Sequence, residues 1–230
     1  MDVYCRKDTD LKPNPCYVAV RMRTIVFLSG WAGSGKDTVA DYLAFHYGFH
    51  RIAFGDFLKR DVAKEKGIPL AAFYDRGLKD TVIPVSDNIT PRDLLLAHAR
   101  KARAVDLDVY ARQAVTEILA LDPSIPIVIS DWRYQRELQF LQDHFKDGIT
   151  TVRIERAGIA PSLDETEHDL DHFCFDHIIR NDGSIQELYK SSQILVPAAG
   201  ASAILKSESK SGRVSCLDGT AFRESRAMAE

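Results

Sequence analysis

A glycine-rich turn between an apolar run and a helical run constrains the fold of this chain more than any other feature. Residues 24–38 read T-I-V-F-L-S-G-W-A-G-S-G-K-D-T. Residues 25–29 favour a buried strand, and residues 37–43 begin a helical pattern. A strand, a glycine turn and a helix in this order are the setting of a phosphate-binding loop (P-loop), whose N–H groups and helix dipole face one anion. We therefore predict that this turn binds phosphate.

The residues of the turn have separate roles in that prediction. Gly30 and Gly35 stand where the turn needs unusual backbone angles or a close approach to the ligand. Lys36 adds a positive charge at the β- and γ-phosphates and is expected to be catalytic. The expected ATP-binding residues are Gly30, Gly33, Ser34, Gly35, Lys36, Asp37 and Thr38. The alternative is an ordinary glycine-rich turn with a solvated lysine.

Asp37 departs from the usual loop, in which a serine or threonine follows the lysine and its hydroxyl holds Mg²⁺. Here Asp37 takes that place and Thr38 comes one residue later. Magnesium prefers oxygen ligands, so a carboxylate can hold it directly or through water. We expect Asp37 to be one metal ligand.

A second carboxylate, Asp131, follows the apolar run at 125–130. At the end of a buried strand it is placed like the magnesium-binding aspartate of P-loop proteins, so it is expected to hold the metal. A helix N-cap is its alternative role and does not exclude the first. Arg133 would face the phosphates from the same edge, or would pair on the surface with Glu137 at i+4.

Arg156 is the third expected catalytic residue, beside Lys36 and Arg133. It lies near the start of a polar segment, 156–174, that reads as a small lid. An arginine that closes over the transferring group stabilises the negative charge of the transition state.

The order of the predicted elements indicates an α/β fold. Strands near 25–28, 50–54, 125–131, 150–154 and 175–179 alternate with helices, which predicts a parallel sheet with helices on both faces. The expected helices include 36–47, one capped by Asp56 after the second strand, and 135–144. Ligands should lie at the carboxyl ends of the strands. The expected domains are an N-terminal extension (1–23), a P-loop kinase domain (24–196) with a helical acceptor-binding insertion (55–122), and a disordered tail (197–230).

Three residues of or near the insertion are expected to bind the acceptor. Arg92 follows Thr90 and Pro91 at a clean helix start, where its guanidinium would hold a phosphate. Arg103 belongs to a basic cluster, which otherwise reads as a solvated face. Trp132 would stack on a base, although aromatic residues are more often part of the core.

Composition limits the class of partner. The chain of 230 residues has a net charge of −3 and 45% hydrophobic residues, which gives no reason to expect nucleic acid or a membrane as a partner. Four scattered cysteines without a C-x-x-C pair favour reduced thiols, and the N-terminus has no secretory apolar region. These features predict a cytoplasmic protein.

Five segments together resemble the deoxynucleoside monophosphate kinases of phages and their relatives, over about residues 24–190. The segments are F-L-S-G-W-A-G-S-G-K-D-T, I-A-F-G-D-F-L-K, T-P-R-D-L-L, I-S-D-W-R-Y-Q-R-E-L and F-D-H-I-I-R-N-D-G-S. The aspartate after the loop lysine is itself a feature of that family. The resemblance implies a nucleoside-monophosphate-kinase-like fold with ATP and Mg²⁺ as donor, a (deoxy)nucleoside monophosphate as acceptor, and Asp56 and Lys59 in the acceptor pocket. Such kinases are often dimers, which leaves a homodimer open.

Three alternatives remain at this point. Animal-type phosphomevalonate kinases share the same skeleton of motifs, so a small-molecule phosphate is an alternative acceptor. A GTPase switch would carry an N-K-x-D segment, and no asparagine in the chain is followed by lysine. A non-catalytic relative would bind nucleotide without turnover, but the intact Gly35-Lys36 and Asp131-x-Arg133 argue against it.

Overall fold

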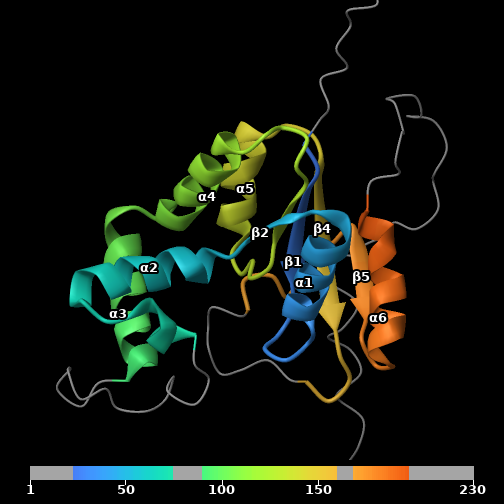
Figure 1. Ribbon diagram of the computed structural model, residues 1–230, viewed down its shortest axis with the longest axis horizontal. Coiled ribbons are helices and arrows are strands. Elements are labelled where there is room, and N and C mark those ends of the chain that lie inside the picture. Colours follow the sequence, from blue (N-terminus) through green and yellow to red (C-terminus); the bar gives the residue numbers. More distant parts are fainter. Residues whose placement is uncertain (1–22, 75–89, 160–167, 197–230) are drawn as a thin grey trace, which may run out of the picture.

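A five-stranded parallel sheet forms the centre of the protein in a computed structural model (Figure 1). The structure describes residues 23–74, 90–159 and 168–196. The strands are β1 (Ile25–Ser29), β2 (His50–Ile52), β3 (Ile127–Ile129), β4 (Ile149–Glu155) and β5 (His177–Arg180). They lie in the order β2-β3-β1-β4-β5, and every neighbouring pair is parallel. All five carboxyl ends therefore meet at one edge of the sheet.

Alternate side chains of β1 point into two separate cores. Ile25 and Phe27 pack with α4 (Val109–Ala120) and α5 (Gln135–His144) on one face of the sheet. Val26 and Leu28 pack with α1 (Lys36–Tyr47) and α6 (Ile185–Ser192) on the other. A strand buried on both faces reads as a continuous apolar run, as this one does. The predicted α/β fold with helices on both faces is confirmed.

Two helices of the region between β2 and β3 extend to one side of the sheet (Figure 1). They are α2 (Phe54–Lys66) and α3 (Pro91–Val105), with the 3₁₀ turn η1 (Leu70–Phe73) between them. Val62, Ile68 and Phe73 form a small separate core there. Thr90 closes a capping box with Asp93, which confirms the predicted start of α3. We call α2, η1 and α3 the lobe.

The junction between β2 and α2 differs from the prediction. A strand was expected over 50–54 and a helix capped by Asp56, but β2 ends at Ile52 and α2 begins at Phe54. Ala53 occupies the N-cap position and supplies no side-chain cap. The capping group comes instead from Asp131, as described below.

Several sequence predictions fall outside the described residues: the extension up to residue 22, residues 160–167 of the expected lid, and the tail 197–230. Cys174 is disulfide-bonded in the structure, which contradicts the expectation of reduced thiols at this position. Among the described residues, no helix combines the length and apolar character that a membrane span requires.

Candidate active site

The loop between β1 and α1 has the backbone geometry that its glycines predict. Gly30 has a φ of 152° and Gly35 a φ of 105°, both in the region that favours glycine. A side chain at Gly30 would also meet the Ile154 carbonyl, and one at Gly35 would meet the Asn181 carboxamide. Backbone angle and space thus both require glycine at these two positions.

The N-terminus of α1 is open to an anion. Gly35 stands at its N-cap position, where no side chain can accept from the first-turn N–H groups. These groups and the helix dipole favour a negative ligand at this end. Lys36 is the first residue of the helix, and its Nζ donates to the Trp31 carbonyl at 3.4 Å. The ammonium group is thereby held over the loop.

A pocket of about 400 Å³ lies directly beside this helix terminus. It brings together several of the residues predicted from sequence: Gly33, Gly35, Lys36, Asp37, Thr38 and Arg156. Its other wall consists of two residues of the turn between β5 and α6, Asn181 and Gly183, and two residues of α6, Ile185 and Leu188. The pocket thus contains a helix N-terminus, a lysine and an arginine. Ser34 is 1% exposed and does not line it.

Asn181 is a site residue that the sequence reasoning did not assign. Its Nδ2 donates to the Ser34 carbonyl at 2.8 Å, and its backbone N–H donates to Glu155 O at 2.7 Å. The turn after β5 therefore fixes the shape of the glycine-rich loop between β1 and α1. The segment R-N-D-G-S was visible in the sequence, but no local signal showed that it reaches a loop 147 residues away.

Asp37 lies at the edge of the pocket and is paired with an arginine. Its Oδ1 accepts from Arg51 Nη2 at 2.7 Å, and its side chain remains 58% exposed. Arg51 also pairs with Asp41 and donates from Nε to Ser130 Oγ at 3.3 Å. The carboxylate predicted to hold metal is thus accessible, with its charge partly balanced by Arg51.

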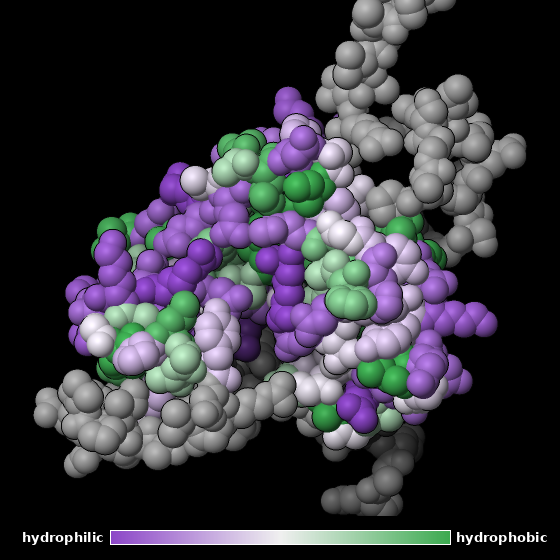
Figure 2. Space-filling model, viewed as in Figure 1, coloured by the Kyte–Doolittle hydropathy of each residue, from purple (hydrophilic) through white to green (hydrophobic). Residues whose placement is uncertain are grey.

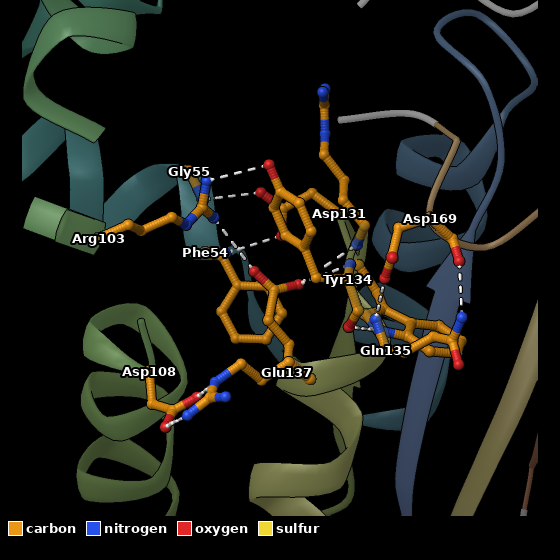
Figure 3. Close-up of polar contacts among 12 residues, drawn as sticks. Phe54, Gly55, Arg103, Asp108, Asp131, Tyr134, Gln135, Glu137 and Asp169 are labelled. Atoms are coloured by element: carbon orange, nitrogen blue, oxygen red, sulfur yellow. Dashed lines mark hydrogen bonds and ion pairs between the residues drawn. The ribbon is translucent and has the colours of Figure 1, made fainter. Parts of the chain in front are cut away.

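Asp131 caps α2 across the sheet edge (Figure 3). Its Oδ1 accepts from Phe54 N and its Oδ2 from Gly55 N, both at 2.7 Å. Burial raises the pKa of the Asp131 carboxyl, while the two backbone donors and Arg133 act in the opposite direction. The N-cap role is therefore present in the structure, although for α2 rather than for the helix that follows Asp131.

Arg103, from the lobe, reaches the loop between β3 and α5 (Figure 3). Its guanidinium donates to the Tyr134 hydroxyl and to Glu137 Oε1, both at 3.3 Å. It also lies 4.4 Å from the centre of the Tyr134 ring and 5.4 Å from that of Tyr110. Arg103 is thus held between two aromatic rings and a carboxylate, not on a solvated face.

Glu137 connects Arg103 to Arg133. Its Oε2 accepts from the backbone N–H of Arg133 at 3.3 Å and of Tyr134 at 3.2 Å. Burial raises the pKa of the Glu137 carboxyl to about 7, against the lowering effect of Arg103. The sequence suggested an i+4 pair between the side chains of Arg133 and Glu137. In the structure Glu137 contacts the backbone of Arg133 and the side chain of Arg103.

The expectation that Trp132 stacks on an acceptor base is wrong. Trp132 is 1% exposed and packs edge-to-face on Phe27 and Phe173, with ring centres 5.4 and 5.0 Å away. Its Nε1 donates to the Tyr134 carbonyl at 2.7 Å, so the indole is satisfied inside the core. No face of the ring is available to a ligand.

The other residues predicted to bind an acceptor belong to the lobe. Lys59 pairs with Asp56 at 2.8 Å and lies 4.1 Å above the ring of Tyr74. Arg92 is exposed in the first turn of α3. The molecular surface is hollowed between the lobe and the body formed by α1 and α6, and hydrophilic residues cover much of its border (Figure 2). Among the described residues no cluster of three or more metal-binding side chains is present.

Comparison with known proteins finds partial matches to kinases. No family model matches the chain. Adenylate kinase isoenzyme 1 of Gallus gallus is 32% identical over 91 residues, which are 39% of this chain and 46% of that protein. The corresponding enzyme of Cyprinus carpio is 33% identical over the same length. The match thus spans about half the length of these curated relatives.

Solved structures are similar only at a low level. The crystal structure of TT1252 from Thermus thermophilus has a TM-score of 0.45 at 17% identity, covering 76% of this chain and 97% of that one. The APS kinase of Mycobacterium tuberculosis in complex with AMPPNP and APS has a TM-score of 0.40 at 14% identity, covering 76% and 97%.

Proposed function

We propose that this protein transfers the γ-phosphate of ATP to a (deoxy)nucleoside monophosphate and releases the nucleoside diphosphate. The observation that supports this most is the pocket at the uncapped N-terminus of α1, with Lys36 and Arg156 in its lining. The partial match to adenylate kinase isoenzyme 1 supports the same class of reaction.

In this proposal the donor phosphates lie against the loop of residues 30–36. Phosphoryl transfer needs alignment and charge neutralisation more than covalent chemistry. The first-turn N–H groups of α1 and the ammonium of Lys36 would neutralise the β- and γ-phosphates. Arg156 would neutralise the transferring group from the other side of the pocket, and Arg133 from the β3 edge.

Magnesium would enter bound to ATP as part of the substrate. Asp37 fits as its protein contact because its carboxylate is exposed at the rim of the pocket. Asp131 would contribute through water, since both of its oxygens already accept from backbone N–H groups of α2. The bound ion would offset negative charge between the β- and γ-phosphates.

The acceptor would lie in the hollow between the lobe and the sheet edge. Its phosphate would be held by Arg92 and Arg103, with Asp56 and Lys59 along the wall formed by α2. Four aromatic residues of this region are candidates for stacking on a base: Trp132 and Tyr110 are buried, Tyr134 is half-buried and Tyr74 is exposed. Tyr74 and Tyr134 are therefore the rings that remain for a base.

An acceptor screen tests the proposal. Purified protein is incubated with ATP, Mg²⁺ and one acceptor at a time: dTMP, dGMP, dCMP, AMP or 5-phosphomevalonate. The proposal expects ADP formation that depends on a nucleoside monophosphate, with the diphosphate identified by chromatography.

Two outcomes of the screen would overturn the proposal. Turnover with 5-phosphomevalonate and with no nucleoside monophosphate would show that the acceptor is a small-molecule phosphate instead of a nucleotide. ATP binding without turnover of any acceptor would assign a non-catalytic nucleotide-binding protein.

A further inference from the structure

Glu137 is a buried carboxylate to which the proposed function gives no role. It stands in the first turn of α5, and its side chain is 7% exposed. One of its oxygens accepts a hydrogen bond from Arg103 of the lobe. The other oxygen accepts hydrogen bonds from two backbone N–H groups of the β3–α5 loop (Figure 3). A single carboxylate thus contacts two separate parts of the proposed site.

Helix capping alone does not explain this arrangement. α6 begins with an equivalent capping box, in which Glu187 accepts from Ser184 N at 2.7 Å while exposed to solvent. A cap therefore works without burial, and burying a carboxylate costs free energy unless it is paired. The partner that distinguishes Glu137 from Glu187 is the guanidinium of Arg103.

The contacts of Arg103 define one orientation for its side chain. The planar guanidinium lies against the rings of Tyr134 and Tyr110, and Glu137 accepts from Nη2. An arginine side chain loses conformational entropy when it binds an anion. Contacts that fix its side-chain torsion angles before binding reduce this cost and improve affinity. Glu137 also fixes the backbone at Arg133, which follows Asp131 at the sheet edge.

We propose that Glu137 is a positioning residue, which orients Arg103 for the phosphate of the acceptor and fixes the β3–α5 loop that carries Arg133. The proposal rests on the proposed function, because it assigns Arg103 to the acceptor side. Glu137 itself does not touch the substrate. Its effect should therefore appear in acceptor binding and not in ATP binding.

The main test is Glu137→Gln. The glutamine oxygen can still accept from the backbone N–H groups, but in assays above pH 7, where Glu137 is ionised, the charged contact with Arg103 is lost. We expect the acceptor KM to rise about 10-fold, the effect of losing one hydrogen bond to a charged group, while the ATP KM changes less than about twofold. Acceptor affinity measured by calorimetry should fall by a similar factor, without any need for turnover.

Two further variants separate positioning from stability. Glu187→Gln removes the capping carboxylate of α6 and should leave the acceptor KM unchanged. In an Arg103→Met background, Glu137→Gln should add little to the acceptor KM, because the two residues act as a unit.

If Glu137→Gln does not fold, Arg103→Lys provides the test. It keeps the charge but not the planar fork, and should raise the acceptor KM alone.

The failures are distinguishable. A wild-type protein that neither binds nor phosphorylates a nucleoside monophosphate would overturn the proposed function. A wild-type protein with that activity, combined with an unchanged acceptor KM in Glu137→Gln, would overturn the role of Glu137 alone. Additive effects of the Glu137 and Arg103 substitutions would also overturn it.

Discussion

Lys36 is the side chain on which the proposed phosphoryl transfer depends most. It combines a position at the open N-terminus of α1 with a place in the pocket lining. We expect Lys36→Ala to lower kcat/KM by about 100-fold or more, because it removes a positioned cation from the developing phosphoryl charge. Steady-state kinetics measures this, and circular dichroism checks the fold. Lys190→Ala, in the exposed last turn of α6, is the control; wild-type rates in Lys36→Ala would remove Lys36 from catalysis.

The buried carboxyl of Glu137 predicts a pH dependence of stability. Its pKa is raised from 4.5 to about 7, chiefly by burial. Between these values the folded protein keeps a proton that the unfolded chain has lost, so this group stabilises the fold below pH 4.5 and the contribution is lost as the pH rises through 7. The slope is at most about 1.4 kcal/mol per pH unit.

Glu137→Gln should therefore reduce the fall in the free energy of unfolding between about pH 4.5 and 7. Urea titrations of both proteins across this interval measure the difference. Glu187→Gln, at an exposed position, should leave the slope in this interval unchanged, because hydrogen bonds from Ser184 lower the pKa of Glu187 and its titration therefore falls below pH 4.5. Identical slopes for wild type and Glu137→Gln would contradict the raised pKa.

At the scale of elements, Asp131 joins β3 to the start of α2. In Asp131→Asn only one side-chain oxygen remains to accept from Phe54 N and Gly55 N. The side-chain NH₂ group then faces the other backbone N–H, and two donors cannot form a hydrogen bond. We expect a loss of about 1–3 kcal/mol in the free energy of unfolding. Chemical denaturation measures it, with Asp122→Asn, an exposed turn carboxylate, as the control. Equal stability of Asp131→Asn and wild type would mean that the capping bonds contribute nothing.

Local signals account for the elements that the sequence predicted well. α1 and α5 have the predicted bounds, Lys36–Tyr47 and Gln135–His144, and Gly48 supplies the left-handed C-cap of α1. The start of α2 was wrong because its capping carboxylate lies about 77 residues away in the sequence. No pattern within one segment can reveal such a partner.

Contacts between residues far apart in the sequence also limited the prediction of the site. The loop residues follow from spacing, because one turn and one helix contain them all. Trp132 and Arg103 depend on long-range packing: Trp132 is enclosed by Phe27 and Phe173, and Arg103 crosses from the lobe to Glu137. Sequence reasoning therefore predicted the residues that line the pocket beside α1 better than it predicted the surroundings of Arg103 and Trp132.

At the scale of the whole molecule, the order of the strands determines where a ligand can bind. The chain leaves β1 for α1 on one face of the sheet and leaves β3 for α5 on the other. In open parallel sheets, a crevice opens at the carboxyl edge between two such strands. The phosphate-binding loop follows β1 and Asp131 lies just beyond β3, so donor and acceptor would approach this one edge from opposite sides.

A crystal structure with a non-hydrolysable ATP analogue and Mg²⁺ tests this account most directly. We expect the β- and γ-phosphates against the backbone N–H groups of residues 30–36, with Lys36 on the γ-phosphate and the nucleoside in the pocket beside Asn181 and Gly183. An analogue bound elsewhere, or a loop that stays empty at saturating concentration, would contradict the account.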